Sequence, residues 1–305
     1  MCELLGLCSN VPATVNFSLS KLAQHGASPD TLHDGWGIGY YEGLDVRLIK
    51  DVNGAAESDW VCFIASHNLR STIVMAHART ATRGTRSYAN AQPFARELAG
   101  RVHLFAHNGD LPGIFGSANF RSRCFVPVGD TDSELAFCAL LDRLQTIWTD
   151  RGTRPKLQRR FQIVSSFARE LRTLGPANFL YSDGEVIFAH GHRRKHGDTG
   201  RVEPPGLVML QRQCDSNAEF AGAGITIAGE PQVITLLASV PLTAESWTPL
   251  AEGELVAVSQ GRLMMQERPL DISNVGARPA PLATHDRKPP LSERPGLPPS
   301  QAARN

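Results

Sequence analysis

The sequence predicts an α+β protein in which antiparallel β-sheets stack face to face and helices lie outside them. Three features predict this class. Short apolar segments of strand length fill the first and last parts of the chain, two long amphipathic helical segments separate them, and the regular alternation of strands and helices that marks a parallel sheet is missing.

The early strands are separated by polar or glycine-rich turns. A helix that begins at Asn16 or Ser18 and stops at Gly26 is expected after the first strand. The glycine-rich run at residues 34–41 leads into a strand rather than a helix, which excludes a dinucleotide-binding loop. The strands expected in this part of the chain are residues 2–7, 34–41, 45–50, 73–77 and 102–107.

Two helices are expected in the middle of the chain. Thr131 and Glu134 form a capping-box pattern, and a second amphipathic segment at residues 156–174 is ended by Gly175 and Pro176. Apolar residues at helical spacing would face the interior in both. They are Leu135, Cys138, Leu141, Leu144 and Ile147 in the first helix, and Leu157, Phe161, Val164, Phe167 and Leu171 in the second.

Strands return after the second helix, and the composition then changes. Further strands are expected at residues 179–182, 186–190, 207–211, 233–240, 254–258 and 263–266. Beyond them proline is frequent and large apolar residues are few, so the segment cannot bury enough surface to offset its ordering entropy. We therefore expect one domain at residues 1–271 and a proline-rich disordered tail at residues 272–305.

Composition and charge exclude several classes of partner. The formal net charge is +1, and basic residues are scattered, so neither nucleic acid nor a membrane surface is expected to bind. Six cysteines occur without a CxxC pair, so neither a metal nor a cofactor is expected. Since the sequence shows no signal peptide and no segment long enough to span a membrane, a cytoplasmic location is expected.

Cys2 is the candidate nucleophile because only Met1 precedes it. Removal of Met1 would leave a thiol and a free α-amino group on one residue. Their ordinary pKa values, about 8.5 and about 7.7–8.0, allow the amine to accept the thiol proton at small cost. The alternative is a buried strand cysteine like Cys62 or Cys138.

Asn108 and Gly109 are candidates for stabilising an oxyanion. They directly follow the strand expected at residues 102–107. A side-chain amide and a glycine N–H can together point at developing negative charge, which is often the largest catalytic contribution. The alternative is an ordinary Asn-Gly turn.

Arg79 and Asp132 could hold the two charged groups of a free amino acid. The guanidinium fork of Arg79 matches a carboxylate, and Asp132 could face an ammonium group. The alternatives are a solvated loop charge for Arg79 and, for Asp132, a residue favoured by the helix dipole. Thr80 and Trp36 are further candidate substrate contacts, although Trp36 could equally pack within its turn. The polar loop at residues 79–93 is expected to act as a lid.

Histidines do not define a second site in the sequence. His190, His192 and His196 are followed or interrupted by basic residues that disfavour a divalent cation, so a solvated loop is expected there. His77 and His107 are expected to be core or hydrogen-bonding histidines, because the proposed chemistry already has its base.

The candidate site residues and the motifs around them together resemble a known family. The chain is similar to class II glutamine amidotransferase domains, which are N-terminal-nucleophile hydrolases, and within them to the stand-alone bacterial YafJ type. The motifs that carry the resemblance are Met1-Cys2-Glu3-Leu4-Leu5-Gly6, Asp34-Gly35-Trp36-Gly37, His77-x-Arg79, Asn90-x-x-Pro93-Phe94, Ala106-His107-Asn108-Gly109 and Thr131-Asp132-Ser133-Glu134.

The resemblance implies a four-layer αββα sandwich and a reaction. Cys2 would attack the γ-amide of glutamine with its own α-amine as base, and Asn108 and Gly109 would hold the oxyanion. Arg79 would bind the α-carboxylate and Asp132 the α-amino group. Gln92 replaces a histidine found in some members, which is expected to affect only the packing of the lid.

The acceptor of the ammonia is not apparent in the sequence. No synthase-like segment follows the amidase-like domain, so an acceptor enzyme is expected to be a separate protein, if there is one. Two alternatives stay open. One is a stand-alone hydrolase of another γ-glutamyl amide, similar to the ergothioneine-pathway hydrolase, and the other is a non-catalytic module that senses glutamine.

Overall fold

The structure is a computed structural model that describes most of the chain before residue 270. The described residues are 2–17, 35–54, 58–67, 69–79, 86–214, 218–220, 225–228 and 231–269. They belong to one compact unit, Met1–Pro269. The proline-rich tail predicted at residues 272–305 lies outside the described residues and stays a prediction.

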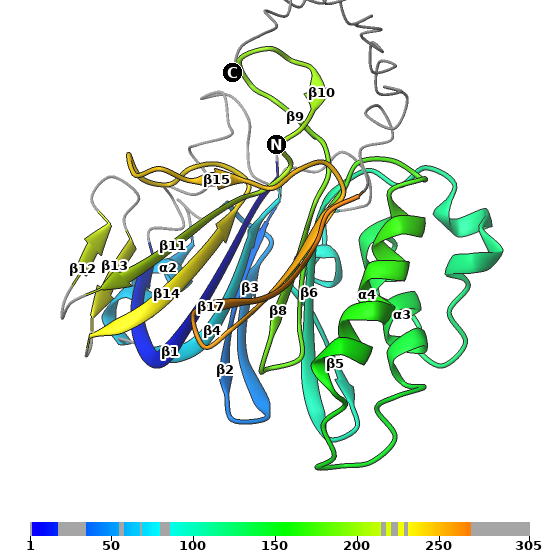
Figure 1. The fold of residues 1–305 in the computed structure, drawn as a ribbon, viewed down its shortest axis with the longest axis horizontal. Helices are drawn as coiled ribbons and strands as arrows, with labels where there is room; N and C mark the ends of the chain where they lie inside the picture. The colour runs from blue at the N-terminus through cyan, green and yellow to red at the C-terminus, as the bar shows by residue number, and fades with distance from the viewer. Residues whose placement is uncertain are drawn as a thin grey trace, which may run out of the picture. The chain divides into compact units, whose positions relative to one another are not determined.

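The larger of the two main sheets has nine strands, and its main path runs β15-β11-β14-β1-β4-β2-β3 (Figure 1). β12 and β13 form a hairpin that joins the sheet through pairing of β13 with β1. The strands are β1 (Glu3–Phe17), β2 (Trp36–Glu42), β3 (Asp45–Asp51), β4 (Arg70–Ala78), β11 (Val208–Cys214), β12 (Ala218–Phe220), β13 (Ile225–Ala228), β14 (Gln232–Ala238) and β15 (Thr248–Pro249).

The second main sheet has six strands in the order β17-β16-β8-β7-β6-β5, and a separate two-stranded pair stands beside it. All pairings in both sheets are antiparallel. The six strands are β5 (Phe94–Leu98), β6 (Arg101–Gly109), β7 (Ala177–Ser182), β8 (Ile187–Gly191), β16 (Glu254–Ser259) and β17 (Arg262–Glu267), and the pair is β9 (Arg194–Lys195) with β10 (Val202–Glu203).

Alternation of side chains along the strands separates the protein into layers. On β1, Leu4 and Cys8 lie in the apolar cluster between the two sheets, whereas Leu5 and Leu7 lie in a second cluster on the opposite face. The same alternation on β6 sends Leu104 between the sheets. The predicted α+β class with stacked antiparallel sheets is therefore confirmed.

Helices cover the outer faces of the two sheets. Ile64 of α2 (Asp59–His67) packs in the outer cluster of the nine-stranded sheet. α3 (Asp132–Leu144) and α4 (Leu157–Leu171) pack on the six-stranded sheet, as Figure 1 shows. The interior residues predicted for both helices are buried or partly buried, with most of them in this outer cluster.

The capping box of α3 is only half formed. Thr131 Oγ1 accepts a hydrogen bond from Glu134 N at 3.3 Å, as predicted. Glu134 does not return a bond to the cap, because its carboxylate accepts N–H groups from Val128 and Gly129 at 3.1 and 2.7 Å and pairs with Arg96. The acidic side chain thus anchors the preceding loop instead.

The early part of the chain departs from the prediction in two places. β1 runs far beyond residue 7, and Asn16 pairs with Thr226 of β13, so Asn16 does not cap a helix. The alternative cap Ser18 lies outside the described residues. The hairpin of residues 34–50 is confirmed, because Trp36 pairs with Asp51 at its open end. Neither α2 nor β5 was expected from the sequence.

Buried histidines are a feature of this fold with a consequence for its stability. His77, His103 and His190 are fully buried. Burial lowers the pKa of His77 and of His190 to about 3 and that of His103 to about 4. These rings are therefore neutral in the folded protein at any pH near neutrality.

We expect the protein to lose stability as the pH falls below about 6.5, the pKa of unfolded histidine. Between about pH 6.5 and the lowered pKa values of the buried histidines, the unfolded state binds more protons than the folded state. Each of the three histidines therefore lowers the free energy of unfolding by up to about 1.4 kcal/mol for each pH unit. Glu3 acts in the opposite direction, because burial raises its pKa. Urea unfolding between pH 7.5 and 5 measures the slope. His190→Asn should reduce this slope by up to about 1.4 kcal/mol per pH unit, because one buried neutral histidine is removed.

Candidate active site

Four segments that are distant in the sequence meet at one end of the two sheets. Glu3 and Trp36 both pair with Ala78, so the start of β1, the start of β2 and the end of β4 share one edge. Cys2 therefore lies across from Arg79. Asn108 and Gly109 end β6 in the other sheet, and a hydrogen bond connects the two edges.

That connection runs from Asn108 to Cys2. Asn108 Nδ2 donates to the carbonyl oxygen of Cys2 at 2.6 Å and makes a longer bond of 3.4 Å to Ser239 Oγ. Because a bond of 3.4 Å is weak, one of the two amide hydrogens is only loosely held. Cys2 itself is partly exposed, and its sulfur is not in a disulfide.

Gly109 occupies a position that no other residue fits. A Cβ atom placed there would lie 1.8 Å from the carbonyl oxygen of Pro176. The close approach lets β6 and the segment before β7 run side by side next to Asn108. Asn108 and Gly109 are therefore the last pair of a strand rather than the centre of a free turn.

His107 and Gln92 support the strand from its other side. Gln92 Oε1 accepts the backbone N–H of His107 at 2.6 Å, and His107 Nδ1 hydrogen-bonds with Ser133 Oγ at 2.9 Å. Burial lowers the pKa of His107, although Asp132 opposes the shift. His107 is a hydrogen-bonding histidine, as expected. Gln92 was expected to affect only the packing of the lid. It also holds the backbone of His107, the residue before Asn108.

Asp132 lies at the start of α3 and is held by the backbone. Its Oδ2 accepts the N–H of Leu111 at 2.8 Å, and its Oδ1 accepts the N–H of Ser133 at 2.8 Å. Leu111 follows Asn108 and Gly109 by only two residues. The Asp132 carboxylate thus links the start of α3 to the segment that carries the candidate oxyanion donors.

Arg79 follows β4 directly and is only 4% exposed, so it is not a solvated loop charge. Its backbone N–H donates to Gly35 O at 2.8 Å, which ties it to the start of β2. Trp36 is fully buried in the outer cluster of the nine-stranded sheet, which favours the packing alternative over a contact with substrate. Thr80 lies outside the described residues.

The described end of the loop at residues 79–93 is attached to the protein body. Asn90 Nδ2 donates to Asp130 Oδ1 at 2.6 Å, and Asp130 N donates back to Asn90 Oδ1 at 3.1 Å. Lys50 Nζ donates to the carbonyls of Tyr88 and Ala91. Residues 80–85 lie outside the described part, so closure of this loop stays a prediction.

The other described cysteines differ from Cys2 in their surroundings. Burial raises the pKa of Cys8 and of Cys138 to about 11, which keeps both thiols protonated. Cys62 was expected to be buried, but it is exposed on α2. None of these three is bonded to Asn108 in the described structure.

The segment around His190 is a second correction. The sequence predicted a solvated loop, yet His190 and His192 are buried, and Arg194 is only 5% exposed. Arg194 Nη2 contacts Glu3 Oε1 at 3.0 Å. The described residues contain no group of three or more His, Cys, Asp or Glu side chains placed to hold a metal ion.

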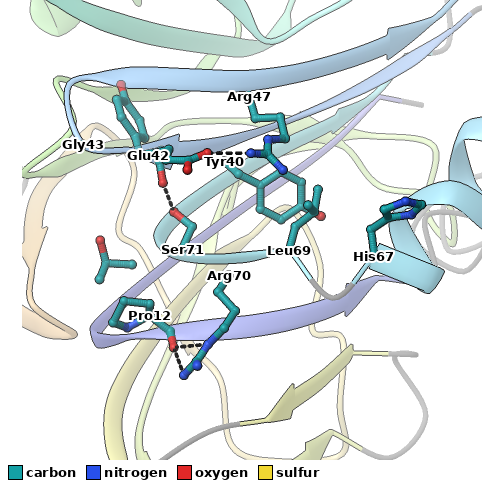
Figure 2. Close-up of a pocket in the computed structure, with 11 residues that line it drawn as sticks. Pro12, Tyr40, Glu42, Gly43, Arg47, His67, Leu69, Arg70 and Ser71 are labelled. Atoms are coloured by element: carbon teal, nitrogen blue, oxygen red, sulfur yellow. Dashed lines mark hydrogen bonds and ion pairs between the residues drawn. The ribbon is translucent and has the colours of Figure 1, made fainter.

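A cavity of about 500 Å³ lies at the opposite end of the nine-stranded sheet (Figure 2). It is lined by the far ends of β2 and β4, including Tyr40 and Ser71, so it is separate from Cys2 and Arg79. Its arginines already have partners: Arg47 pairs with Glu42, and Arg70 donates to Pro12 O.

Within the described part of the chain, no helix is long and apolar enough to cross a lipid bilayer.

Comparison with known proteins assigns the family. The family model of the class II glutamine amidotransferases matches residues 1–279. The chain belongs to the class II glutamine amidotransferases. It is 38% identical over 259 residues to the putative glutamine amidotransferase YafJ of Escherichia coli, and the match covers 83% of this chain and 96% of YafJ.

Solved structures agree with this assignment. A predicted glutamine amidotransferase from Pseudomonas aeruginosa superimposes with a TM-score of 0.61 and 30% identity, over 87% of this chain and all of that one. Glutamine phosphoribosylpyrophosphate amidotransferase from B. subtilis shares the fold alone, with a TM-score of 0.56 and 15% identity over 88% of this chain and 49% of that one. The predicted αββα fold of N-terminal-nucleophile hydrolases is confirmed.

We expect Gly109→Ala to destabilise the protein by about 2–3 kcal/mol, because the new methyl group would overlap a backbone oxygen that cannot rotate away. Gly116→Ala is the matched control, since a Cβ atom at Gly116 meets nothing within 4 Å. The control should stay within about 0.5 kcal/mol of the parent protein in urea unfolding. Equal stability of the two variants would show that the close approach at Gly109 is not required.

Proposed function

We propose that the protein hydrolyses the γ-amide of glutamine with Cys2 as an N-terminal nucleophile. The observation that carries the proposal is the 2.6 Å hydrogen bond between Asn108 and Cys2, which brings an amide donor of one sheet to the thiol-bearing residue of the other. Membership of the class II glutamine amidotransferases supports the choice of glutamine.

The reaction would use two functions of one residue. Removal of Met1 would give Cys2 a free α-amino group, which accepts the thiol proton while sulfur adds to the γ-carbonyl carbon. The carbon–nitrogen bond then breaks, and the protonated amine returns its proton to the leaving ammonia. Water adds to the thioester and releases glutamate, which restores the thiol.

Charge on the carbonyl oxygen would be stabilised by Asn108 and Gly109. The second N–H of the Asn108 amide, whose contact with Ser239 Oγ is long, would donate to the oxyanion while the first keeps its bond to Cys2. The Gly109 N–H would be the second donor, and one such donor is typically worth about 3–4 kcal/mol. Both donors are on a strand end braced by His107, Gln92 and Asp132, which favours preorganisation.

The amino-acid head of the substrate would be bound by Arg79 and Asp132. Arg79 would form two parallel hydrogen bonds to the α-carboxylate, and Asp132 would accept the α-ammonium group. Thr80 and Trp36 are further proposed substrate contacts. The buried position of Trp36 makes an indirect role in shaping the pocket the better-supported form of that assignment.

The released ammonia would pass to an acceptor enzyme that the family relationship does not identify. Hydrolysis of another γ-glutamyl amide and sensing of glutamine without turnover are the competing functions. A screen of γ-glutamyl amides for amine release distinguishes them. Glutamine as the best substrate supports the proposal, a different amide as the best substrate favours the hydrolase, and binding without turnover favours the sensor.

We expect Cys2→Ala to lower glutaminase activity by about 10,000-fold or more, because the attacking atom is lost. Binding of glutamine, measured by calorimetry, should persist. Substitution of the exposed Cys62 by alanine is the control and should leave activity unchanged.

Intact-mass measurement should show a chain that begins at Cys2, and a glutamine-like diazoketone should label Cys2. Full ammonia release by Cys2→Ala would refute the nucleophile assignment.

We expect Arg79→Lys to raise KM for glutamine by roughly 10- to 100-fold with little change in kcat, because a point charge replaces a two-bond fork. Glutamine α-amide is the matched control substrate, since it lacks the carboxylate that Arg79 would bind. The variant and the parent protein should handle this analogue alike. An unchanged KM for glutamine would remove Arg79 from the proposed substrate clamp.

A further inference from the structure

Residues 192–194, which we call the strap, connect β8 to β9 and contact both main sheets beside Cys2. Figure 1 shows β9 near the start of β1, in agreement with the contact between Arg194 and Glu3. The three residues differ in exposure: His192 and Arg194 are buried, whereas Arg193 is exposed. Two of the three strap side chains are thus buried at the edge where the candidate site residues meet.

The strap is bound to the six-stranded sheet through Asn178 of β7. Asn178 Nδ2 donates to the carbonyl of Asn108 at 3.0 Å and to the carbonyl of Arg193 at 2.7 Å. Asn178 Oδ1 accepts the N–H of His192 at 2.7 Å. One fully buried amide therefore joins the backbone of Asn108 to the backbone of the strap.

The strap is bound to the nine-stranded sheet through Arg194. Its Nη2 pairs with Glu3 Oε1 at 3.0 Å, and its Nη1 donates to the carbonyl of Ser239. Ser239 in turn accepts the N–H of Leu4 at 3.0 Å through its hydroxyl group. The same hydroxyl makes the longer contact with Asn108 Nδ2. Arg194 thus holds both the side chain that follows Cys2 and the backbone of Ser239, whose hydroxyl makes the long 3.4 Å contact with the Asn108 amide.

The energetics of this pair favour a role in geometry over a role in stability. Glu3 is fully buried and Arg194 nearly so, so both charges have given up their hydration. Apolar residues of similar volume often stabilise a protein as well as a buried ion pair does. The directional bonds that such a pair makes, however, cannot be replaced by apolar contacts.

We propose that Arg194 is a positioning residue that keeps Cys2 and Asn108 in register. It holds the strap to Glu3 and Ser239 of one sheet edge, and Asn178 holds the same strap to the backbone of Asn108. Arg194 would act on the reaction without touching the substrate. This inference rests on the proposed function, because positioning matters for catalysis only if Cys2 is the nucleophile.

The test replaces the pair without leaving a buried charge unpaired. The main variant carries Glu3→Leu and Arg194→Met together, and the matched control carries Arg193→Met and Glu252→Leu. Arg193 of the strap forms an exposed ion pair of 2.8 Å with Glu252, which lies just before β16 and is also 3.5 Å from His192 Nε2. A third variant, Arg194→Lys, keeps the charge but replaces the planar two-armed fork with a single point charge.

We expect the apolar variant to fold with a melting temperature close to that of the parent protein, while kcat for glutamine falls roughly 100-fold, as for a small misplacement of reacting groups. KM should hardly change, because Arg79 and Asp132 are untouched. Arg194→Lys should give an intermediate kcat, and the exposed control pair should have parental kinetics.

A second measurement does not depend on glutaminase activity. The rate at which iodoacetamide alkylates Cys2 can be measured by peptide mapping at several pH values. Its dependence on pH should differ between the apolar variant and the parent protein. The alkylation rate of the exposed Cys62 should be the same in both proteins. If the parent protein fails to hydrolyse glutamine, the proposed function is wrong, and alkylation still decides the role of Arg194. Parental kcat and parental Cys2 alkylation in the folded apolar variant would overturn the inference. If that variant does not fold, unchanged values in Arg194→Lys would overturn it.

Discussion

The hydrogen bond between the Asn108 amide and the Cys2 carbonyl is the contact on which the site depends. The two residues are 106 positions apart, and each belongs to a different sheet. Apolar packing between sheets fixes their separation well but resists sliding only weakly, whereas a hydrogen bond of 2.6 Å is directional. The bond therefore joins the two stacked sheets at the candidate site, and the neighbouring polar contacts keep its two ends in place.

Those neighbouring contacts arise where the strand ladders stop. β5 pairs with β6 only as far as Phe105, so the N–H of His107 lies beyond the ladder, and Gln92 accepts it. β14 pairs with β1 only from Leu5 onward, and Ser239 accepts the N–H of Leu4. Buried backbone groups need partners, and side chains supply them at these ends. The same requirement that completes the backbone bonding thus orders the residues around Cys2.

Local sequence patterns predicted the parts of the fold that local physics decides. Helical spacing identified α3 and α4, and short apolar runs identified most of the strands, although not the full length of β1. Arg194 was expected to lie in a solvated loop because it stands in a run of three basic residues, Arg193 to Lys195. Its partner Glu3 is 191 residues away, so no window of sequence contains the reason for its burial. Gln92 was underestimated for the same reason, since its partner strand lies outside its own loop.

Asp132 shows how one side chain can couple binding to chemistry at such a site. A carboxylate has about four acceptor positions, and the N–H groups of Leu111 and Ser133 use two of them. The Ser133 hydroxyl makes a further, longer contact with Oδ1 at 3.4 Å. In the proposed mechanism the remaining acceptor positions would receive the α-ammonium group of the substrate, and a side chain already held in place lowers the entropy cost of binding. Because Leu111 continues the segment of Asn108 and Gly109, loss of the carboxylate would also release the candidate oxyanion donors. Under the proposed function, a defect in a variant at Asp132 would therefore contain both a binding and a catalytic component, whereas a variant at Arg79 would change binding alone.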